Sequence, residues 1–549
     1  MKSLEDRVAY LETQLIAHGI SNADATAWFS PRDATVDGPA AMAYDAQDDT
    51  PHDFTSDLAR GALSADPFAQ SLVNKNGLSL LSSLLADPVS RTLRSEGASH
   101  HALLHDLPYE TRASIPPIEA ASRLIHTYFE HCDFFSPILS SESDFISMIA
   151  PLYDARDTET SKSLANAKFR AFIIFGTAVL LLNRSDSSVP ISRSEGYFAA
   201  GMHTLSQHAD LILTGDADHV TNLLLIIQHC CFCANLTAAW HFIGLVTRLV
   251  VELGLHDERQ TTSYTSDQTN ARRWLFWSTY VLERNLCVII GRPFSIPDGA
   301  IKIPLPTATE DEPRRLLALH QIKVRQFESE MYTTLNYARA GSFDGAAWRA
   351  DIHNRLVQWR TSVPTFALDH SSQFAPPEIF DGHFANTVTL LYYPSSLLPV
   401  SSDRDLGILA EHASDSIVAY RTAFRSGRLR FYWRTVHNLF RSGMAIVYCI
   451  REASERAGLD FGPRDLKSLL HSCSSIIWGM VERYPPGKAY RDVFDTVVAA
   501  TLSNESPVGP NLGDQRSMFD LISTGYEEDL PASILTTMSW GFGTPLQDR

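Results

Sequence analysis

The sequence predicts an all-α protein built around one large helical domain. With 549 residues, of which 44% are hydrophobic and 20% charged, the chain has enough apolar side chains for a large core. Between residues 117 and 502, apolar residues recur at steps of three and four, separated by short breaks at Gly and Pro. No sustained alternation of apolar and polar residues appears, so strands are not expected.

Composition divides the chain into five predicted segments. They are a coiled-coil helix at residues 1–18, an acidic linker at 19–76, a helical or irregular connector at 77–117, the large helical domain at 118–502 and an acidic-hydrophobic tail at 503–549. The linker has nine aspartates and no glutamate between residues 21 and 75, and it buries too little apolar surface to fold alone, so we expect it to be disordered. The tail mixes acidic and apolar residues as activation segments do, and a plain flexible tail gives the same pattern.

The first segment contains a short apolar seam, made by Leu4, Val8, Leu11 and Leu15. Their spacings of four, three and four residues are those of the a and d positions over about two heptads. A dimerisation helix and a helix packed on the core of its own chain would both produce this pattern. On the residues alone, both alternatives stay open.

Residues 272–306 predict a buried helix followed by an ordered loop. The expected helix face consists of mostly apolar residues spaced by three and four, namely Trp274, Trp277, Ser278, Val281, Leu282, Asn285 and Ile289. Gly291 then supplies the positive φ that ends a helix. Pro293 and Pro297 prevent the helix from continuing.

Two further apolar stretches predict core helices. Residues 171–182 form the longest apolar run, about half the length that a membrane-spanning helix needs. Residues 433–448 carry aromatic, aliphatic and Met side chains at helical spacing, among them Val436, Leu439, Phe440, Met444 and Val447. Such stripes usually build the interfaces of helix bundles, and the lining of a ligand pocket is the alternative.

Charge and cysteine usage restrict the possible functions. The formal net charge is −17, from 46 basic and 63 acidic residues, so the chain as a whole is not attracted to nucleic acid. Its seven cysteines are scattered through apolar patterns, which predicts reduced thiols in an intracellular compartment. Cys230, Cys231 and Cys233 lie close together, but neighbouring positions on a helix point about 100° apart, so we expect buried small side chains rather than a metal site.

No catalytic or cofactor motif is visible, because HExxH, GxSxG, P-loop and Rossmann fingerprints are all absent from the sequence. The aspartate cluster of a terpene-cyclase-like all-α enzyme is superficially offered by Asp48, Asp49 and Asp53, but the surrounding composition is that of a linker. His101 and His105 are an i, i+4 pair without evident further zinc ligands. We therefore expect no catalytic residue, no cofactor and no enzyme activity.

The order of motifs in residues 272–306 adds information that periodicity lacks. The stretch RRWLFWSTYVLERNLCVIIGRPFSIPDGAIKIPLP resembles the regulatory domain of fungal zinc-cluster transcription factors. The residues that carry the resemblance are Arg273, Phe276, Trp277, Arg284, Gly291, Arg292 and Pro293. Glu283 and Lys302 depart from the common pattern, which has Asp at both positions. Weaker similarity, in the same order at 128–139, 239–256, 392–394 and 482–495, extends the resemblance over roughly residues 118–500.

The resemblance implies a nuclear transcription regulator that acts as a dimer and controls a metabolic or secondary-metabolite gene set. The expected partners are a second copy of the chain or an intact zinc-cluster transcription factor, together with the transcription machinery. Contact with promoter DNA is expected only indirectly or through a further N-terminal module. No membrane partner is expected.

In this family a basic cluster of six cysteines binds zinc and DNA and precedes the coiled coil. No cysteine precedes Cys132, and Met1 falls almost where that module would end. Two explanations follow as expectations. Either the start is shortened and zinc belongs to a missing cluster, or the chain is a zinc-finger-less coregulator that binds an intact transcription factor through its N-terminal seam.

Overall fold

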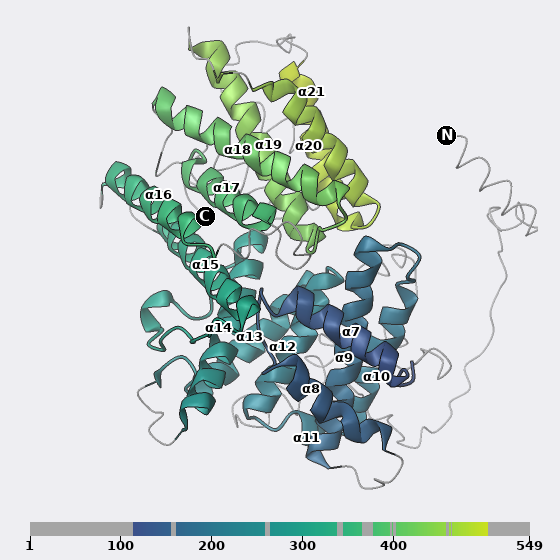
Figure 1. Ribbon diagram of the computed structural model, residues 1–549. Coiled ribbons are helices and arrows are strands. Elements are labelled where there is room, and N and C mark those ends of the chain that lie inside the picture. Colours follow the sequence, from purple (N-terminus) through teal and green to yellow (C-terminus); the bar gives the residue numbers. More distant parts are fainter. Residues whose placement is uncertain are drawn as a thin grey trace, which may run out of the picture. The chain divides into compact units, whose positions relative to one another are not determined.

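The computed structural model describes residues 113–502, except for 155–160, 259–263, 338–343, 365–376, 396–397, 399–401, 457–460 and 463. Within these residues the secondary structure consists of α-helices and short 3₁₀ turns, without a strand (Figure 1). The predicted all-α class is therefore confirmed. The predicted coiled-coil helix, acidic linker and tail lie outside the described residues, all of which belong to one unit of the chain, Asp53–Arg549.

One apolar helix, α9 (Lys162–Ser185), organises the first group of helices, which we call the N-terminal bundle. The other members are α7 (Ile118–Cys132), α8 (Glu142–Ile149), α10 (Ser192–Gln207), α11 (Ala209–Ile212), α12 (Ala217–Phe232), α13 (Leu236–Glu252) and α14 (Ser266–Ile290), with a 3₁₀ turn at Ala150–Tyr153. Helix α9 packs against α7, α8, α10 and α12, while α13 and α14 pack against α12.

The apolar run 171–182 lies in α9 and is a core element. By length and composition alone α9 is apolar enough to cross a membrane. Its apolar window is nevertheless 89% buried against the rest of the fold, with Phe169, Ile173 and Phe175 fully enclosed. This burial satisfies the hydrophobic surface of the helix within the protein, as the sequence predicted for a core helix.

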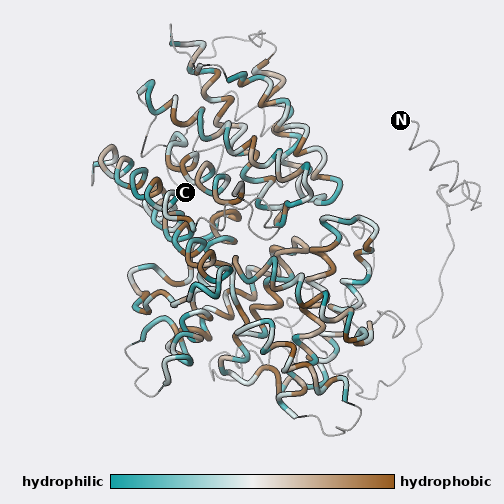
Figure 2. Tube along the Cα trace, in the orientation of Figure 1, coloured by the Kyte–Doolittle hydropathy of each residue, from teal (hydrophilic) through white to brown (hydrophobic). Residues whose placement is uncertain are grey.

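A second group of helices, the C-terminal bundle, is joined to the first by α15 (Pro313–Tyr337). Its members are α16 (Gly345–Thr361), α17 (Pro377–Tyr392), α18 (Asp403–Arg425), α19 (Tyr432–Glu455), α20 (Leu466–Val481) and α21 (Lys488–Leu502), with 3₁₀ turns at Asp298–Ala300 before α15 and Pro485–Gly487 before α21. Helix α15 packs on α14 and also on α16 and α17. In both groups the hydrophobic residues gather on the helix sides that face other helices (Figure 2).

The ends of two helices follow the local rules that the sequence suggested. Thr265 and Gln268 form a capping box that starts α14, and Gly291, with φ of 65°, ends it. Gly254 has φ of 63° after α13, and the buried Leu255 behind it donates its N–H to a carbonyl of the last turn at 2.9 Å. The predicted helix end at Gly291 is confirmed, and Gly254 forms an αL cap of the same kind.

Helix α19 supplies the core of the C-terminal bundle and contacts the N-terminal bundle at its first turn. Its predicted stripe is fully buried, namely Val436, Leu439, Phe440, Met444 and Val447. At the start of the helix, the indole Nε1 of Trp433 donates to the carbonyl of Cys231 at 2.8 Å. The Phe431 ring lies between Phe232 and Phe135, with centroid distances of 4.7 and 5.0 Å. These contacts seal the two bundles against each other.

The cysteines behave as small apolar side chains with one exception. Cys230 and Cys231 are buried as predicted. Cys233 is exposed, contrary to the expectation, because α12 ends at Phe232 and the next residue has left the packed face of the helix. Among the described residues no group of three His, Cys, Asp or Glu side chains is placed to hold a metal ion.

Close packing of α19 against α21 predicts the effect of a single methyl group. A Cβ added at Gly443 would overlap a ring carbon of the fully buried Phe494, so the ring or one of the two helices would have to shift. We expect Gly443→Ala to lower the free energy of unfolding by about 1–3 kcal/mol, because overpacking a core forces strained rotamers. Denaturant titration followed by circular dichroism measures the change.

The matched control is Gly407→Ala on α18, where an added Cβ meets nothing within 4 Å. Because Ala loses less backbone entropy than Gly in a helix, this variant should gain about 0.5–1 kcal/mol. Equal behaviour of the two variants would show that α19 and α21 are not in close contact.

Candidate functional site

The motif residue Arg284 ties the loop after α14 to the fold. Its buried guanidinium donates to the Ile296 carbonyl at 2.6 Å, to Asp298 Oδ1 at 2.9 Å and to Ser329 Oγ of α15 at 3.1 Å. The same group also pairs with the neighbouring Glu283 carboxylate. A charge with this many hydrogen-bond partners is stable in the interior, so Arg284 fixes the path of residues 291–298.

The partners of Arg284 are themselves held in place. Glu283 Oε1 accepts from the Ser295 N–H at 2.6 Å, and Ser329 Oγ donates to Asp298 Oδ2 at 2.6 Å. Arg284 also lies 4.2 Å from the centroids of the Tyr280 and Phe294 rings. Each carboxylate oxygen of Glu283 and Asp298 accepts a hydrogen bond within this network. We therefore interpret the network as a structural clamp and not as a reactive site.

The remaining motif residues have structural positions too. Phe276 and Trp277 are buried, and the Trp277 indole donates to the Pro304 carbonyl at 2.8 Å. Arg273 pairs with Glu258 at 2.5 Å. Arg292 is exposed and lies 5.4 Å from the centroid of the Trp240 ring, and Pro293 is exposed beside it. Together with the αL residue Gly291, these side chains build the exit of α14.

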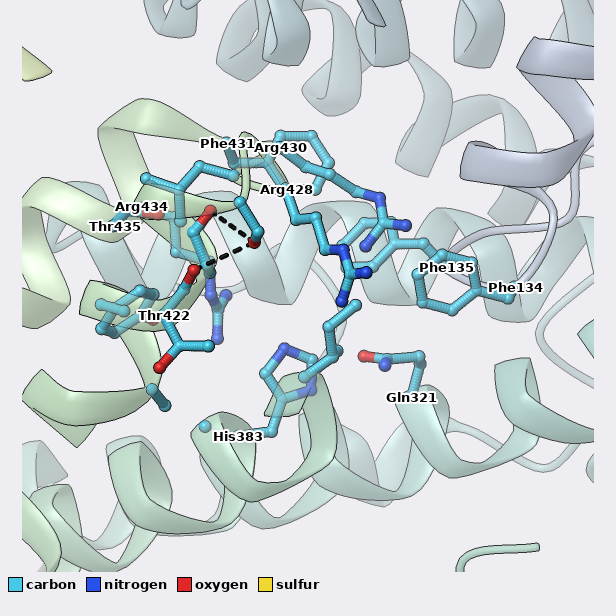
Figure 3. A pocket seen from close by; sticks show the side chains of 17 residues that line it. Phe134, Phe135, Gln321, His383, Thr422, Arg428, Arg430, Phe431, Arg434 and Thr435 are labelled. Carbon is cyan, nitrogen blue, oxygen red and sulfur yellow. Dashed lines mark hydrogen bonds between the residues drawn. The ribbon is translucent and has the colours of Figure 1, made fainter. Parts of the chain in front are cut away.

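A cavity of about 110 Å³ lies where the two bundles meet (Figure 3). Its walls come from the loop after α7, from α15, α17 and α18, and from the start of α19. Phe134, Phe135 and Phe431 contribute aromatic rings to its lining. The lining runs from exposed residues such as Thr422 to the fully buried Gln321, so the cavity leads from the surface toward the interior.

Charged and polar side chains of two helices meet beside this cavity. On α15 they are Gln321, Arg325, Glu328 and Ser329, and on α19 they are Arg434, His437, Asn438 and Arg441, all buried. Glu328 accepts from Arg434 at 2.9 Å and also pairs with Arg325 on its own helix. One carboxylate thus faces two guanidinium groups, and we call these three residues the Glu328 cluster.

Burial shifts the pKa values of the charged groups around the cavity. Burial lowers the pKa of Arg325 to about 9, and the charge of Arg434 adds to this shift. Burial likewise lowers the pKa of Arg430 to about 10. The pKa of His383 lies well below its ordinary value because of burial and of the positive charges of Arg325, Arg434 and Arg430. His383 is therefore neutral at physiological pH.

Sequence reasoning missed this cavity, although a signal for it exists. Polar residues of α19 lie at positions 434, 437, 438 and 441, with spacings of three, one and three. Polar residues of α15 lie at positions 321, 325, 328 and 329, with spacings of four, three and one. Each set is a polar stripe at helical spacing. A polar stripe usually faces solvent, and only the fold shows that Glu328 of one stripe is bonded to Arg434 of the other.

Several candidates from the sequence lie outside the described residues. They are the seam residues Leu4, Val8, Leu11 and Leu15, the aspartates Asp48 and Asp49, and the histidines His101 and His105. The apolar seam stays a prediction. The motif residues and the cavity are therefore the described features from which a function is inferred.

Residues 125–336 match the family model described as the fungal specific transcription factor domain. This stretch of the chain is similar to that domain, and relatives that the chain resembles are fungal regulators of transcription. The matched segment covers α15 almost to its end and stops before the C-terminal bundle.

Three relatives illustrate the similarity. The chain is 26% identical over 256 residues to pyrimidine pathway regulatory protein 1 of Saccharomyces cerevisiae. This alignment covers 41% of this chain and 28% of that protein. The chain is 22% identical over 514 residues to the positive regulator of purine utilization of Emericella nidulans, covering 73% and 48% of the two chains. Protein STB5 of Saccharomyces cerevisiae is 23% identical over 405 residues, covering 68% and 53%. The chain spans about half the length, or less, of these curated relatives.

The Arg284 clamp predicts a large loss of stability on substitution. We expect Arg284→Ala to lower the free energy of unfolding by about 3–5 kcal/mol, because it leaves the buried Glu283 carboxylate without its counter-charge. Thermal and denaturant unfolding of the purified chain measure the effect. Arg248→Ala removes an exposed arginine of α13 and should change stability by no more than about 0.5 kcal/mol. Similar losses in the two variants would rule out the clamp.

Proposed function

We propose that this protein is a nuclear regulator of transcription whose helical domain controls the activity of a promoter-bound complex. The observation that carries the proposal is the match of residues 125–336 to the fungal specific transcription factor domain. The names of the relatives support a role in metabolic gene control, since two of them are regulators of pyrimidine and purine pathways. The names describe the relatives, so control of a metabolic gene set by this protein is proposed.

The proposal assigns the described helices a regulatory rather than a DNA-contacting role. The chain carries a formal net charge of −17, which opposes approach to the phosphate backbone. Two arginines of the described domain, Arg284 and Arg325, are committed to buried pairs and are unavailable to DNA. Contact with promoter DNA is therefore assigned to a zinc-cluster module, either in the same protein or in a partner.

The proposed regulator acts as a dimer through the apolar seam at Leu4, Val8, Leu11 and Leu15. Two heptads give a short coiled coil, so the association is expected to depend on each seam position. A second copy of the chain and an intact zinc-cluster factor are both suitable partners for such a seam.

Recruitment to a reporter gene tests the regulatory role. The full chain fused to a heterologous DNA-binding domain is expected to raise or lower expression from the matching promoter several-fold relative to the DNA-binding domain alone. The same fusion carrying Arg284→Ala, which disrupts the helical domain, should lose the effect. The proposal is contradicted if the wild-type fusion is present in the nucleus and neither raises nor lowers expression of the reporter.

Charge placed in the seam tests dimerisation. We expect the double substitution Leu11→Glu and Leu15→Glu to convert the chain from a dimer to a monomer in sedimentation equilibrium, because like charges at facing a and d positions repel. Leu58→Glu, outside the seam in the predicted linker, is the matched control and should leave the mass unchanged. A wild-type chain that sediments as a monomer, alone and with a zinc-cluster partner, would remove the seam from the proposal.

A further inference from the structure

The cavity at the junction of the two bundles is lined by residues with buried polar atoms that have no hydrogen-bond partner in the part of the chain that the structure describes. Gln321 is 0% exposed, and neither its amide nitrogen nor its amide oxygen has a hydrogen-bond partner among the described residues. Arg434 is 8% exposed, and its Nη1 has none either. The buried Nδ1 of His383 is in the same situation. All three residues line the cavity.

Such groups are costly to leave unpaired, because water has been removed from them without replacement. Native proteins rarely keep several in one place unless a ligand or a function requires them. Here they come from three different helices, α15, α17 and α19, and lie around one hollow (Figure 3). The site therefore offers donors and an acceptor that are already in place.

The charge around the cavity is positive. Glu328 is shared by Arg325 and Arg434, so this cluster carries one negative and two positive charges. Arg430 brings a further guanidinium to the lining, placed 4.6 Å from the centroid of the Phe134 ring. An anion at this point would offset the excess charge in a region of low dielectric, where such pairing is strong.

Apolar side chains make up another part of the lining, beside the polar residues Tyr420, Thr422, Ser426, Arg428 and Thr435. Phe134, Phe135 and Phe431 supply rings, and Ile379 and Leu429 supply aliphatic surface. A ligand that matches both halves carries one anionic group and an apolar or aromatic body. A strongly hydrated inorganic ion would leave the rings uncovered and would lose more solvation on entry.

We propose that this cavity binds a small organic carboxylate, with its carboxyl group on Arg434, Gln321 and His383 and its apolar body against Phe134, Phe135 and Phe431. The ligand joins residues of α15 to residues of α17 and α19, and so it couples the segment that matches the transcription factor domain to the C-terminal bundle. A regulatory role for this binding rests on the proposed function. The binding itself does not.

Thermal unfolding of the purified full chain tests the site, with sodium benzoate, phenylacetate and hexanoate as probes at constant ionic strength. At ten times its Kd, a bound probe should raise Tm by about 1–3 °C. Benzamide, which has the shape of benzoate without its charge, should not. No shift with any of the three carboxylates up to millimolar concentration overturns the proposal, and an equal shift with inorganic phosphate replaces a carboxylate site by a site for phosphate.

Two variants separate binding from stability. Gln321→Leu removes an unpaired buried amide, so the free protein should be as stable as the wild type or more so, while the shift caused by the carboxylate should disappear. Ala423→Phe places a ring in the cavity without changing any charge and should also abolish the shift. Gln358→Leu, the same substitution at an exposed position of α16, should leave the shift intact.

A carboxylate shift that survives in both cavity variants would place the binding elsewhere and overturn the assignment. Because these measurements need no promoter, their failure is distinct from a failure of the proposed function. A chain that drives the reporter but binds no carboxylate loses only this inference. A chain that binds carboxylate without affecting a reporter keeps the site and loses its regulatory role.

Discussion

The attachment of α15 to α19 depends on the Glu328 carboxylate. It pairs with Arg325 on its own helix and with Arg434 of α19, and without it two buried guanidinium groups would lie side by side unneutralised. The neighbouring residue, Ser329, receives the guanidinium of Arg284 from α14. Helix α15 is therefore bonded both to Arg284 of α14 and to Arg434 of α19. A displacement of α15 would change both sets of contacts.

The parts of this fold that obey local rules were predictable from the sequence. Trp277 and its neighbours lie on the buried face that their spacing predicted, and Gly291 ends the helix because its left-handed φ suits no other residue as well. Gln321 and Arg434 were not predictable as a site, since they are more than one hundred residues apart in the chain and only packing brings their helices together. The exposure of Cys233 depended on where α12 ends, a boundary that periodicity defines poorly.

The similarity to transcription regulators and the cavity are independent observations on this protein. The matched range contains residues that shape helices and their exits, such as Trp277 and Arg284, and their contacts help to hold the fold together. The cavity does not depend on the resemblance, and its excess of positive charge is a property of this chain's own packing.

The position of α15 also bears on how such proteins diverge. The matched segment ends at residue 336, one residue before α15 ends, yet the charged side of that helix is completed by Arg434, which lies far beyond the match. The end of the matched family domain and the end of the packed helical unit therefore do not coincide. A C-terminal bundle exchanged near residue 336 would have to supply an arginine that reaches Glu328, because otherwise Glu328 would lose its partner from α19.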